Sequence, residues 1–269
     1  KIHKSVDKEV NASAEWAESQ DDPKPDDALK NIYAEPQHFM REPETKGDKI
    51  VLVDAINHAI DEELSFNNKT VVYGQDIAGG KGGVFTATKG LTDKHGKERV
   101  FNAPLAESSI IGTAIGMATL GYKPIIEIQF GDYIWTSMMQ IRNEVATMRY
   151  RSNGDWSCPF VMRVPVGGYI HGALCHSQSI DGFFTHLPGI RIAFPSNASD
   201  AKGLLKAACS MNDPVLFLEH KGLYRQGFAS SEEPDENYLL EFGKANIVTV
   251  GSDITIVTWG ALVQKSIEA

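Results

Sequence analysis

The sequence lacks a hydrophobic run long enough to span a membrane, and it contains few cysteines. Its apolar runs are far shorter than the roughly 18 to 20 residues that a bilayer-spanning helix needs, and no basic-then-apolar signal segment opens the chain. Its three cysteines, Cys158, Cys175 and Cys209, are widely spaced and form no CxxC pair, which argues against a disulfide framework and a closed zinc site. We therefore expect a soluble, cytoplasmic protein with reduced thiols and no membrane partner.

Positive charge is also scarce, with 26 lysines and arginines against 35 acidic residues and a formal net charge of -9. A nucleic-acid partner would require a basic face that neutralises phosphates, so we expect none. What the sequence does contain is apolar material: 42% of the 269 residues are hydrophobic. This is enough for one large core or two smaller ones.

The first 48 residues differ in pattern from the rest. Ile2, Val6, Val10 and Ala14 fall four residues apart and predict a short amphipathic helix. The run DDPKPDD (21–27) then ends it with two prolines and four acids. We interpret this segment as a docking tail or linker without a core of its own.

From residue 49 onward, helical patterns alternate with strands that are apolar on both faces. We expect helices at 52–65, 108–120, 134–150 and 199–210, and strands at 70–76, 125–130, 160–166, 190–196 and 214–220. Such alternation is typical of a doubly wound α/β fold, a parallel sheet with helices on both faces.

The acidic, turn-rich run SSEEPDEN (230–237) indicates a domain boundary, and DITIVTWG (253–260) predicts one further buried strand before a terminal helix. The expected domains are therefore 1–48, 49–230 and 231–269. Because one strand and one helix cannot form a domain, we expect the chain to be part of a longer protein.

Two glycine-containing segments leave alternatives open. The loop AGGKGGVF (78–85) would let backbone N–H groups approach a phosphate, but it matches neither common phosphate-binding pattern, so an ordinary flexible loop is favoured. Gly112 and Gly116 lie on one helix four residues apart, where small residues permit close packing, either inside the chain or against another subunit.

Glu107 and Tyr133 stand where strands give way to helices. Glu107 precedes the 108–120 helix and, taken alone, is most simply its N-terminal cap. Acids at such junctions also face the ligand crevice at the carboxyl ends of parallel strands. Tyr133, after the strand at 125–130, is suited to stack on a planar ring, although core packing is the commoner role.

The run GGYIHGALCHSQS (167–179) places His171 and His176 five residues apart with Cys175 between them. This spacing is not that of helical zinc ligands, and no carboxylate lies beside it, so a metal site is disfavoured. A loop histidine near the sheet edge suits proton transfer or anion stabilisation. The residues alone thus indicate a crevice bounded by Glu107, Tyr133 and His176, with no defined reaction.

Several longer segments, in order over roughly residues 48–225, resemble the β component of the thiamin-diphosphate-dependent 2-oxo acid dehydrogenases. They are GGVFTATKGL, RVFNAPLAESSIIGTAIGMATLGYKPIIEIQF, QIRNEVA, GALCHSQS, HLPGIRIAFPSNASDAKGLLKAA and DPVLFLEHKGLY. EIQFGDYIW and HGALCHSQS are more similar to the branched-chain (2-oxoisovalerate) members. EWAESQDDPKPDDALKNIYAEP resembles the end of the family's α component, which implies a fused α/β chain.

The resemblance implies a role for four residues. Glu107 matches the glutamate that hydrogen-bonds the aminopyrimidine of thiamin diphosphate and favours its imino tautomer. Tyr133 matches the aromatic residue that stacks on that ring, and Leu105 an apolar residue against the cofactor. His176 matches the histidine implicated in acyl transfer to a lipoyl group. His171 is left as a substrate-side or loop-ordering neighbour and Cys175 as a packing residue.

The implied activity is oxidative decarboxylation of a 2-oxo acid, with 3-methyl-2-oxobutanoate favoured and pyruvate as the alternative. The acyl group would pass to the lipoyl domain of a dihydrolipoyl acyltransferase. Further implied partners are an α-type domain and a second copy of the fused chain in an α2β2-like assembly.

The resemblance also implies which parts of the cofactor site, with its thiamin diphosphate, Mg²⁺ and K⁺, this chain contains. The motif for Mg²⁺ and pyrophosphate, GDG followed by Asn, belongs to the α-type portion, and a structural K⁺ held by backbone carbonyls is a further family feature. Gln75 stands where family members commonly have an acid. We therefore expect the isolated chain to bind thiamin diphosphate weakly and to be inactive, or to serve as a non-catalytic assembly module.

Overall fold

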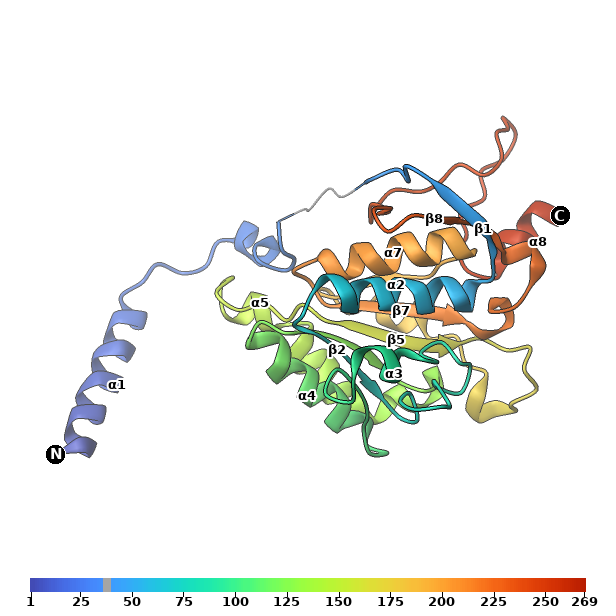
Figure 1. The fold of residues 1–269 in the computed structure, drawn as a ribbon. Coiled ribbons are helices and arrows are strands. Elements are labelled where there is room, and N and C mark those ends of the chain that lie inside the picture. Colours follow the sequence, from blue (N-terminus) through green and yellow to red (C-terminus); the bar gives the residue numbers. More distant parts are fainter. Residues whose placement is uncertain (36–39) are drawn as a thin grey trace. The chain divides into compact units, whose positions relative to one another are not determined.

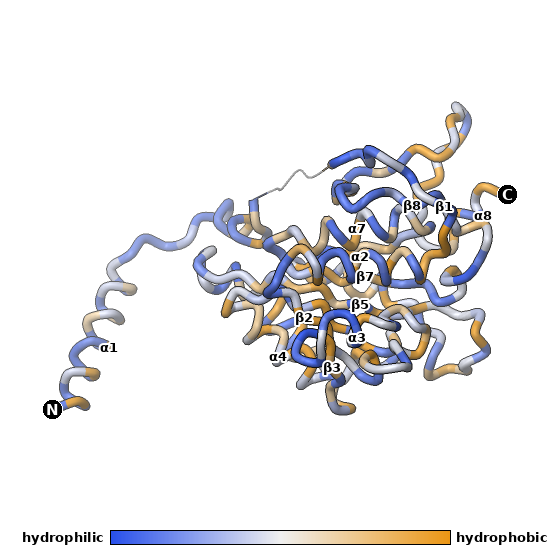
Figure 2. The backbone as a smooth tube through the Cα atoms, viewed as in Figure 1, coloured by the Kyte–Doolittle hydropathy of each residue, from blue (hydrophilic) through white to orange (hydrophobic). Residues whose placement is uncertain are grey.

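The computed structural model describes residues 1–35 and 40–269, which form two compact units, Lys1–Lys30 and Asn31–Ala269. The first unit consists of helix α1 (Ile2–Glu18) and a 3-10 turn at Pro25–Leu29. The predicted helix is confirmed, and Figure 2 shows hydrophobic and hydrophilic residues alternating along it. None of its residues is buried, so its apolar stripe has no cover within this unit.

The second unit is built on a six-stranded sheet in which every neighbouring pair is parallel (Figure 1). Its order is β3-β2-β4-β5-β7-β6. The strands are β2 (Thr70–Gly74), β3 (Val100–Asn102), β4 (Lys123–Glu127), β5 (Val161–Val166), β6 (Arg191–Ala193) and β7 (Val215–His220). The predicted doubly wound α/β fold is confirmed.

Helices cover both faces of this sheet. On one face α2 (Leu52–Phe66) packs with α7 (Ala198–Ser210), and on the other lies α4 (Glu107–Thr119). Successive strand residues point to opposite cores, as Val71 and Val72 do. This is why each strand reads as apolar on both faces. Shorter helices are α3 (Leu91–His95), α5 (Met148–Arg151), α6 (Asp181–Phe184) and α8 (Leu262–Glu268).

The single helix predicted at 134–150 is broken into three pieces. They are a 3-10 segment at Gly131–Ser137, a π segment at Gln140–Val145 and α5. In the first piece, Ser137 Oγ donates to the Ile134 carbonyl at 2.8 Å. Such side-chain bonds to the preceding turn compete with a regular helix.

The C-terminal region differs from the sequence prediction. Residues 253–260 are irregular and mostly exposed, and they join neither sheet of the described chain, so the predicted buried strand is wrong. In addition, β1 (Lys46–Ile50) and β8 (Ser231–Pro234) pair in a two-stranded antiparallel sheet. The polar sequences KGDKI and SEEP carry no strand pattern, so this pair escaped prediction.

Within residues 1–35 and 40–269, every helix is too short or too polar to cross a lipid bilayer. The cytoplasmic location stays a prediction.

Candidate functional site

The carboxyl ends of the six parallel strands meet at one edge of the sheet, where the chain changes direction between β2 and β4. From β2 the chain moves outward to β3, and it then crosses back over β2 to reach β4 on the other side. Ligand crevices of doubly wound sheets open at such a switch point. Gln75 follows β2 and Tyr133 follows β4, so both lie at this place.

Glu107 is the first residue of α4, and its carboxylate is held by two neutral donors. Gln75 Nε2 donates to Glu107 Oε1 at 2.9 Å, and Thr136 Oγ1 lies 3.2 Å from Oε2. The N-cap of α4 is Ala106, and no side chain caps the helix. The capping interpretation of Glu107 is therefore wrong, because its oxygens are used by residues that follow β2 and β4.

Tyr133 and His176 form a direct pair. The Tyr133 hydroxyl lies 2.8 Å from His176 Nε2, while His176 Nδ1 lies 2.9 Å from the Gly172 carbonyl. Phe130 stands edge-on to the imidazole, with 4.6 Å between ring centroids. Burial, followed by the nearby Asp132 carboxylate, raises the pKa of Tyr133, so the phenol stays protonated at neutral pH.

Thr136 links the two predicted parts of the crevice, because its hydroxyl also lies 3.1 Å from the Tyr133 carbonyl. We call Gln75, Glu107, Tyr133, Thr136 and His176 the carboxyl-edge site. The structure thus brings Glu107, Tyr133 and His176 together as expected from the sequence. It adds Gln75 and Thr136, whose contacts no local pattern indicates.

The loop that carries His176 has an unusual backbone. Tyr169, His171 and Ala173 all have positive φ values, of 71°, 57° and 56°, each costing on the order of 1 kcal/mol. The loop is fastened at its far end, where Gln178 N donates to Asp132 Oδ2 at 3.3 Å. Strain of this kind persists where surrounding contacts enforce it.

The other predicted residues near the site are exposed on the surface of the protein. Leu105 is 84% exposed, two residues before Glu107, so an apolar face is free at the start of α4. His171 and Cys175 are also exposed. The packing role expected for Cys175 is therefore wrong, since its side chain is not enclosed.

Lys221 is a buried cation that the sequence analysis missed. It follows β7, is 4% exposed, and its Nζ lies 5.4 Å from the centre of the Phe130 ring. Its ammonium has no hydrogen-bond partner among the described residues. Burial lowers the pKa of Lys221 to about 8, partly opposed by the Asp132 carboxylate.

A second missed feature is a buried ion cluster in the middle of the sheet. Arg163 on β5 donates to Glu219 on β7 at 2.7 and 2.9 Å and to Glu127 on β4 at 2.9 Å. Tyr224 donates to Glu219 at 2.6 Å. Burial raises the pKa of Glu127 to about 7 in spite of Arg163. The available signal was a charged residue within each of three otherwise apolar strands, namely Glu127, Arg163 and Glu219.

The glycine-rich loop 78–85 is compact. A Cβ on Gly82 would lie 2.3 Å from the Lys89 backbone, and Gly82 O accepts from Thr88 N at 3.0 Å. The glycine serves close backbone approach in this loop rather than flexibility.

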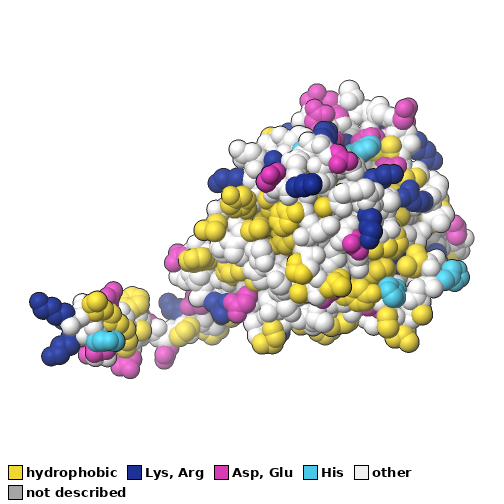
Figure 3. All heavy atoms as spheres, turned by 60° about the horizontal axis from the view of Figure 1, so that its bottom comes forward, with side chains coloured by type: hydrophobic (Ala, Val, Ile, Leu, Met, Phe, Trp, Pro, Cys, Tyr) yellow, Lys and Arg dark blue, Asp and Glu magenta, His cyan; other side chains and the backbone are white. Residues whose placement is uncertain are grey.

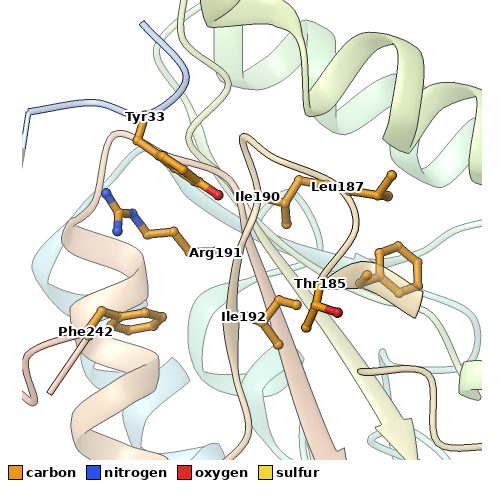
Figure 4. A pocket seen from close by; sticks show the side chains of 9 residues that line it. Tyr33, Thr185, Leu187, Ile190, Arg191, Ile192 and Phe242 are labelled. Carbon is orange, nitrogen blue, oxygen red and sulfur yellow. The ribbon is translucent and has the colours of Figure 1, made fainter. Parts of the chain in front are cut away.

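A hollow of about 430 Å³ lies beside β6, and Figure 4 shows the side chains that line it. Its only charged lining residue, Arg191, is engaged by Asp213 at 2.7 Å and by the Tyr33 ring. The hollow shares no residue with the carboxyl-edge site. In the described parts of the chain, no three His, Cys, Asp or Glu side chains gather in a way that would hold a metal ion.

The small-residue face of α4 is open. A Cβ on Gly112 or on Gly116 would meet no atom within 4 Å, so the described chain does not pack against them. Figure 3, in which the bottom of Figure 1 is turned forward, shows hydrophobic side chains gathered in several groups on that side of the molecule. Large exposed apolar residues nearby in sequence are Leu105, Leu120, Tyr122 and Met139.

Comparison with known proteins identifies the family of this chain. Residues 48–226 match the family model of the transketolase pyrimidine-binding domain. The chain is 50% identical over 217 residues to the 2-oxoisovalerate dehydrogenase subunit beta of Bacillus subtilis, covering 81% of this chain and 65% of that protein. It is 42% identical over 221 residues to the pyruvate dehydrogenase E1 component subunit beta of the same organism, covering 82% and 67%.

Among solved structures, a split-gene transketolase described as an inactive beta4 tetramer has a TM-score of 0.63 at 24% identity, covering 81% of this chain and 65% of that one. That likeness supports the fold alone. The chain thus spans about two thirds of the relatives it matches, and the family match covers the whole parallel sheet. The chain belongs to the transketolase pyrimidine-binding domain family and, within it, to the β components of the 2-oxo acid dehydrogenases.

Proposed function

We propose that this chain supplies the aminopyrimidine-binding half of the active site of a thiamin-diphosphate-dependent 2-oxo acid dehydrogenase. The observation that carries the proposal is the Glu107 carboxylate at the switch point of the sheet, held by Gln75 and Thr136 with Tyr133 beside it. A partly exposed carboxylate in a crevice, fixed by neutral donors, is suited to hold a proton on a ring nitrogen.

The residues present fit the pyrimidine half of the cofactor. Glu107 would accept a hydrogen bond from the ring, the Tyr133 ring would contact its face, and exposed Leu105 would add apolar contact. When bound, thiamin diphosphate supplies the electron sink that makes loss of carbon dioxide possible. The part of this chain is to orient the ring and to hold the proton that Glu107 shares with it.

His176 would act in the following transfer of the acyl group to a lipoyl group. In that step a bond from the acyl carbon to one sulfur would form as the S–S bond breaks, and the other sulfur would keep the electron pair and take up a proton. The bond between the acyl carbon and the cofactor would break and the hydroxyl proton would leave as the carbonyl forms. His176 is half-buried in the site and paired with Tyr133, and it could supply the proton to sulfur.

The substrate we favour is 3-methyl-2-oxobutanoate, with pyruvate as the alternative. The support is the 50% identity to the B. subtilis 2-oxoisovalerate subunit against 42% to the pyruvate subunit. A pocket that distinguishes isopropyl from methyl gains only about 1 to 3 kcal/mol per methylene. A panel of 2-oxo acids assayed on the assembled enzyme decides between them.

We further propose that the partner is an α-type portion that carries the Mg²⁺ and diphosphate site, in an α2β2-like assembly that acylates a lipoyl domain. The open Gly112 and Gly116 face of α4 is suited to such a subunit contact. The domain limits 1–48, 49–230 and 231–269 and a structural K⁺ belong to the same proposal. The family match at 48–226 supports the central domain.

Replacing Glu107 tests the catalytic part of this proposal. In the assembled enzyme, Glu107→Gln should lower the rate of 2-oxo acid decarboxylation by about 10²- to 10⁴-fold, because an amide cannot exchange the proton. Glu98→Gln, at an exposed glutamate before β3, is the matched control and should retain full activity. Substantial activity in the Glu107 variant would refute the assignment.

Calorimetry separates catalysis from assembly alone. Thiamin diphosphate with Mg²⁺ should bind the assembled enzyme and bind this chain alone weakly, since Mg²⁺ and diphosphate contacts supply much of the affinity. Assembly without cofactor binding in either sample would favour the module without catalysis.

A further inference from the structure

We propose that Tyr133 is a positioning residue for His176: its hydroxyl donates to Nε2 of the imidazole, whose Nδ1–H bonds to Gly172, and keeps Nε2 directed into the carboxyl-edge site. This inference rests on the proposed function for the role of His176, and it goes beyond the ring stacking expected of Tyr133. Tyr133 would then have two separate roles: its ring would contact the cofactor, and its hydroxyl would bond to His176.

The tautomer follows from the partners of the two ring nitrogens. Gly172 offers His176 Nδ1 only a carbonyl oxygen, at 2.9 Å, so Nδ1 must carry the hydrogen. A neutral imidazole has one donor and one acceptor, which leaves Nε2 as the acceptor. Tyr133 is 2.8 Å from Nε2, and its hydroxyl therefore donates.

Three further contacts fix this pair in place. The edge-on packing of Phe130 at 4.6 Å limits rotation of the imidazole. On the other side, Tyr133 N donates to the Phe130 carbonyl at 3.0 Å, and Asp132 accepts from Gln178 N. The short segment after β4 thus holds the His176 loop at two points.

The consequence concerns which nitrogen exchanges protons. With Nδ1 committed to Gly172, His176 can take up the proton released from the hydroxyl as the carbonyl forms only at Nε2, the atom that Tyr133 contacts, and can pass it from there to a lipoyl sulfur. A group that orients a catalytic base and fixes its tautomer acts through that base. Loss of the hydroxyl should therefore affect acyl transfer more than decarboxylation.

The test is Tyr133→Phe in the assembled enzyme, with two rates measured. Decarboxylation is followed with an artificial electron acceptor, and acyl transfer with a free lipoyl domain. Acyl transfer should fall at least about tenfold more than decarboxylation. In a His176→Gln background, Tyr133→Phe should cause no further loss, since the two residues act as a unit. Tyr150→Phe, at a tyrosine 49% exposed, is the control and should leave both rates unchanged.

Equal loss of both rates, or additive losses in the double variant, would overturn the proposal. If the wild-type enzyme decarboxylates no 2-oxo acid, the proposed function fails, and imidazole ¹⁵N NMR still tests the contact. The wild-type protein should show His176 as the Nδ1–H tautomer with a hydrogen-bonded Nε2, and Tyr133→Phe should shift the Nε2 resonance because that hydrogen bond is lost. A His176 spectrum unaltered by Tyr133→Phe would then contradict the positioning role.

Discussion

The buried Arg163 cluster permits a stability prediction with a large expected effect. Arg163 and Glu219 are fully buried and Glu127 is 4% exposed, so the guanidinium is the one positive charge in contact with two buried carboxylates. Arg163→Met keeps an apolar side chain of moderate length and removes the charge together with the three hydrogen bonds.

Removing one partner of a buried ion pair costs about 3 to 5 kcal/mol, because the remaining charge stays desolvated. That is a large part of the roughly 5 to 15 kcal/mol that stabilises a typical domain. The loss should also grow with pH. Without Arg163 the carboxylates are driven to take up protons, so the variant is relatively more stable in acid and loses stability as the pH rises.

Urea unfolding of the wild type and the variant at pH 5 and pH 8 measures this loss. The midpoint should fall by about 1 M urea or more at pH 8, and by less at pH 5. A fall that is equal at both pH values, or a cost below about 1 kcal/mol at pH 8, would refute the account of the cluster.

Glu127→Gln is the matched control, and its effect should have the opposite sign. The folded-state pKa of Glu127 is raised from 4.5 to about 7. The wild type therefore loses stability as the pH rises through that range, and the amide does not. Glu127→Gln should be near neutral at pH 5 and neutral or stabilising at pH 8.

Two further predictions concern single side chains. Lys221→Met should raise the free energy of unfolding at pH 7 by on the order of 1 kcal/mol, because a charged form disfavoured by burial is removed. The folded-state pKa of Lys221 is lowered from 10.5 to about 8, so this gain in the free energy of unfolding should shrink as the pH rises from 8 towards 10.5. A gain that does not change with pH would show that burial of the charged ammonium is not its cause. Asn197→Ala removes the cap of α7, where the Asn197 side chain accepts a hydrogen bond from Asp200 N at 2.9 Å. The change should lower the free energy of unfolding by about 0.5 to 2 kcal/mol, measured by thermal or urea unfolding. An unchanged midpoint would show that the cap is dispensable.

Much of the fold was predictable because its main pattern is local. Helices α2 and α7 lie within one or two residues of the predicted ranges, since their apolar residues recur with helical spacing. Prediction failed where local preference was overridden. The helix-prone segment after Tyr133 bends to place Thr136 against Glu107, and residues 253–260 join neither sheet of the described chain.

The sequence by itself determined the alternation of strands and helices, hence the parallel sheet and the edge at which Glu107, Tyr133 and His176 gather. These properties follow from hydrophobic periodicity and from the geometry of parallel strands. Only the tertiary structure decided the pairings. Gln75 and Glu107 are 32 residues apart, Tyr133 and His176 are 43, and Arg163 and Glu219 are 56. Such contacts depend on which strands are neighbours and how loops close between them, and no local pattern carries that information.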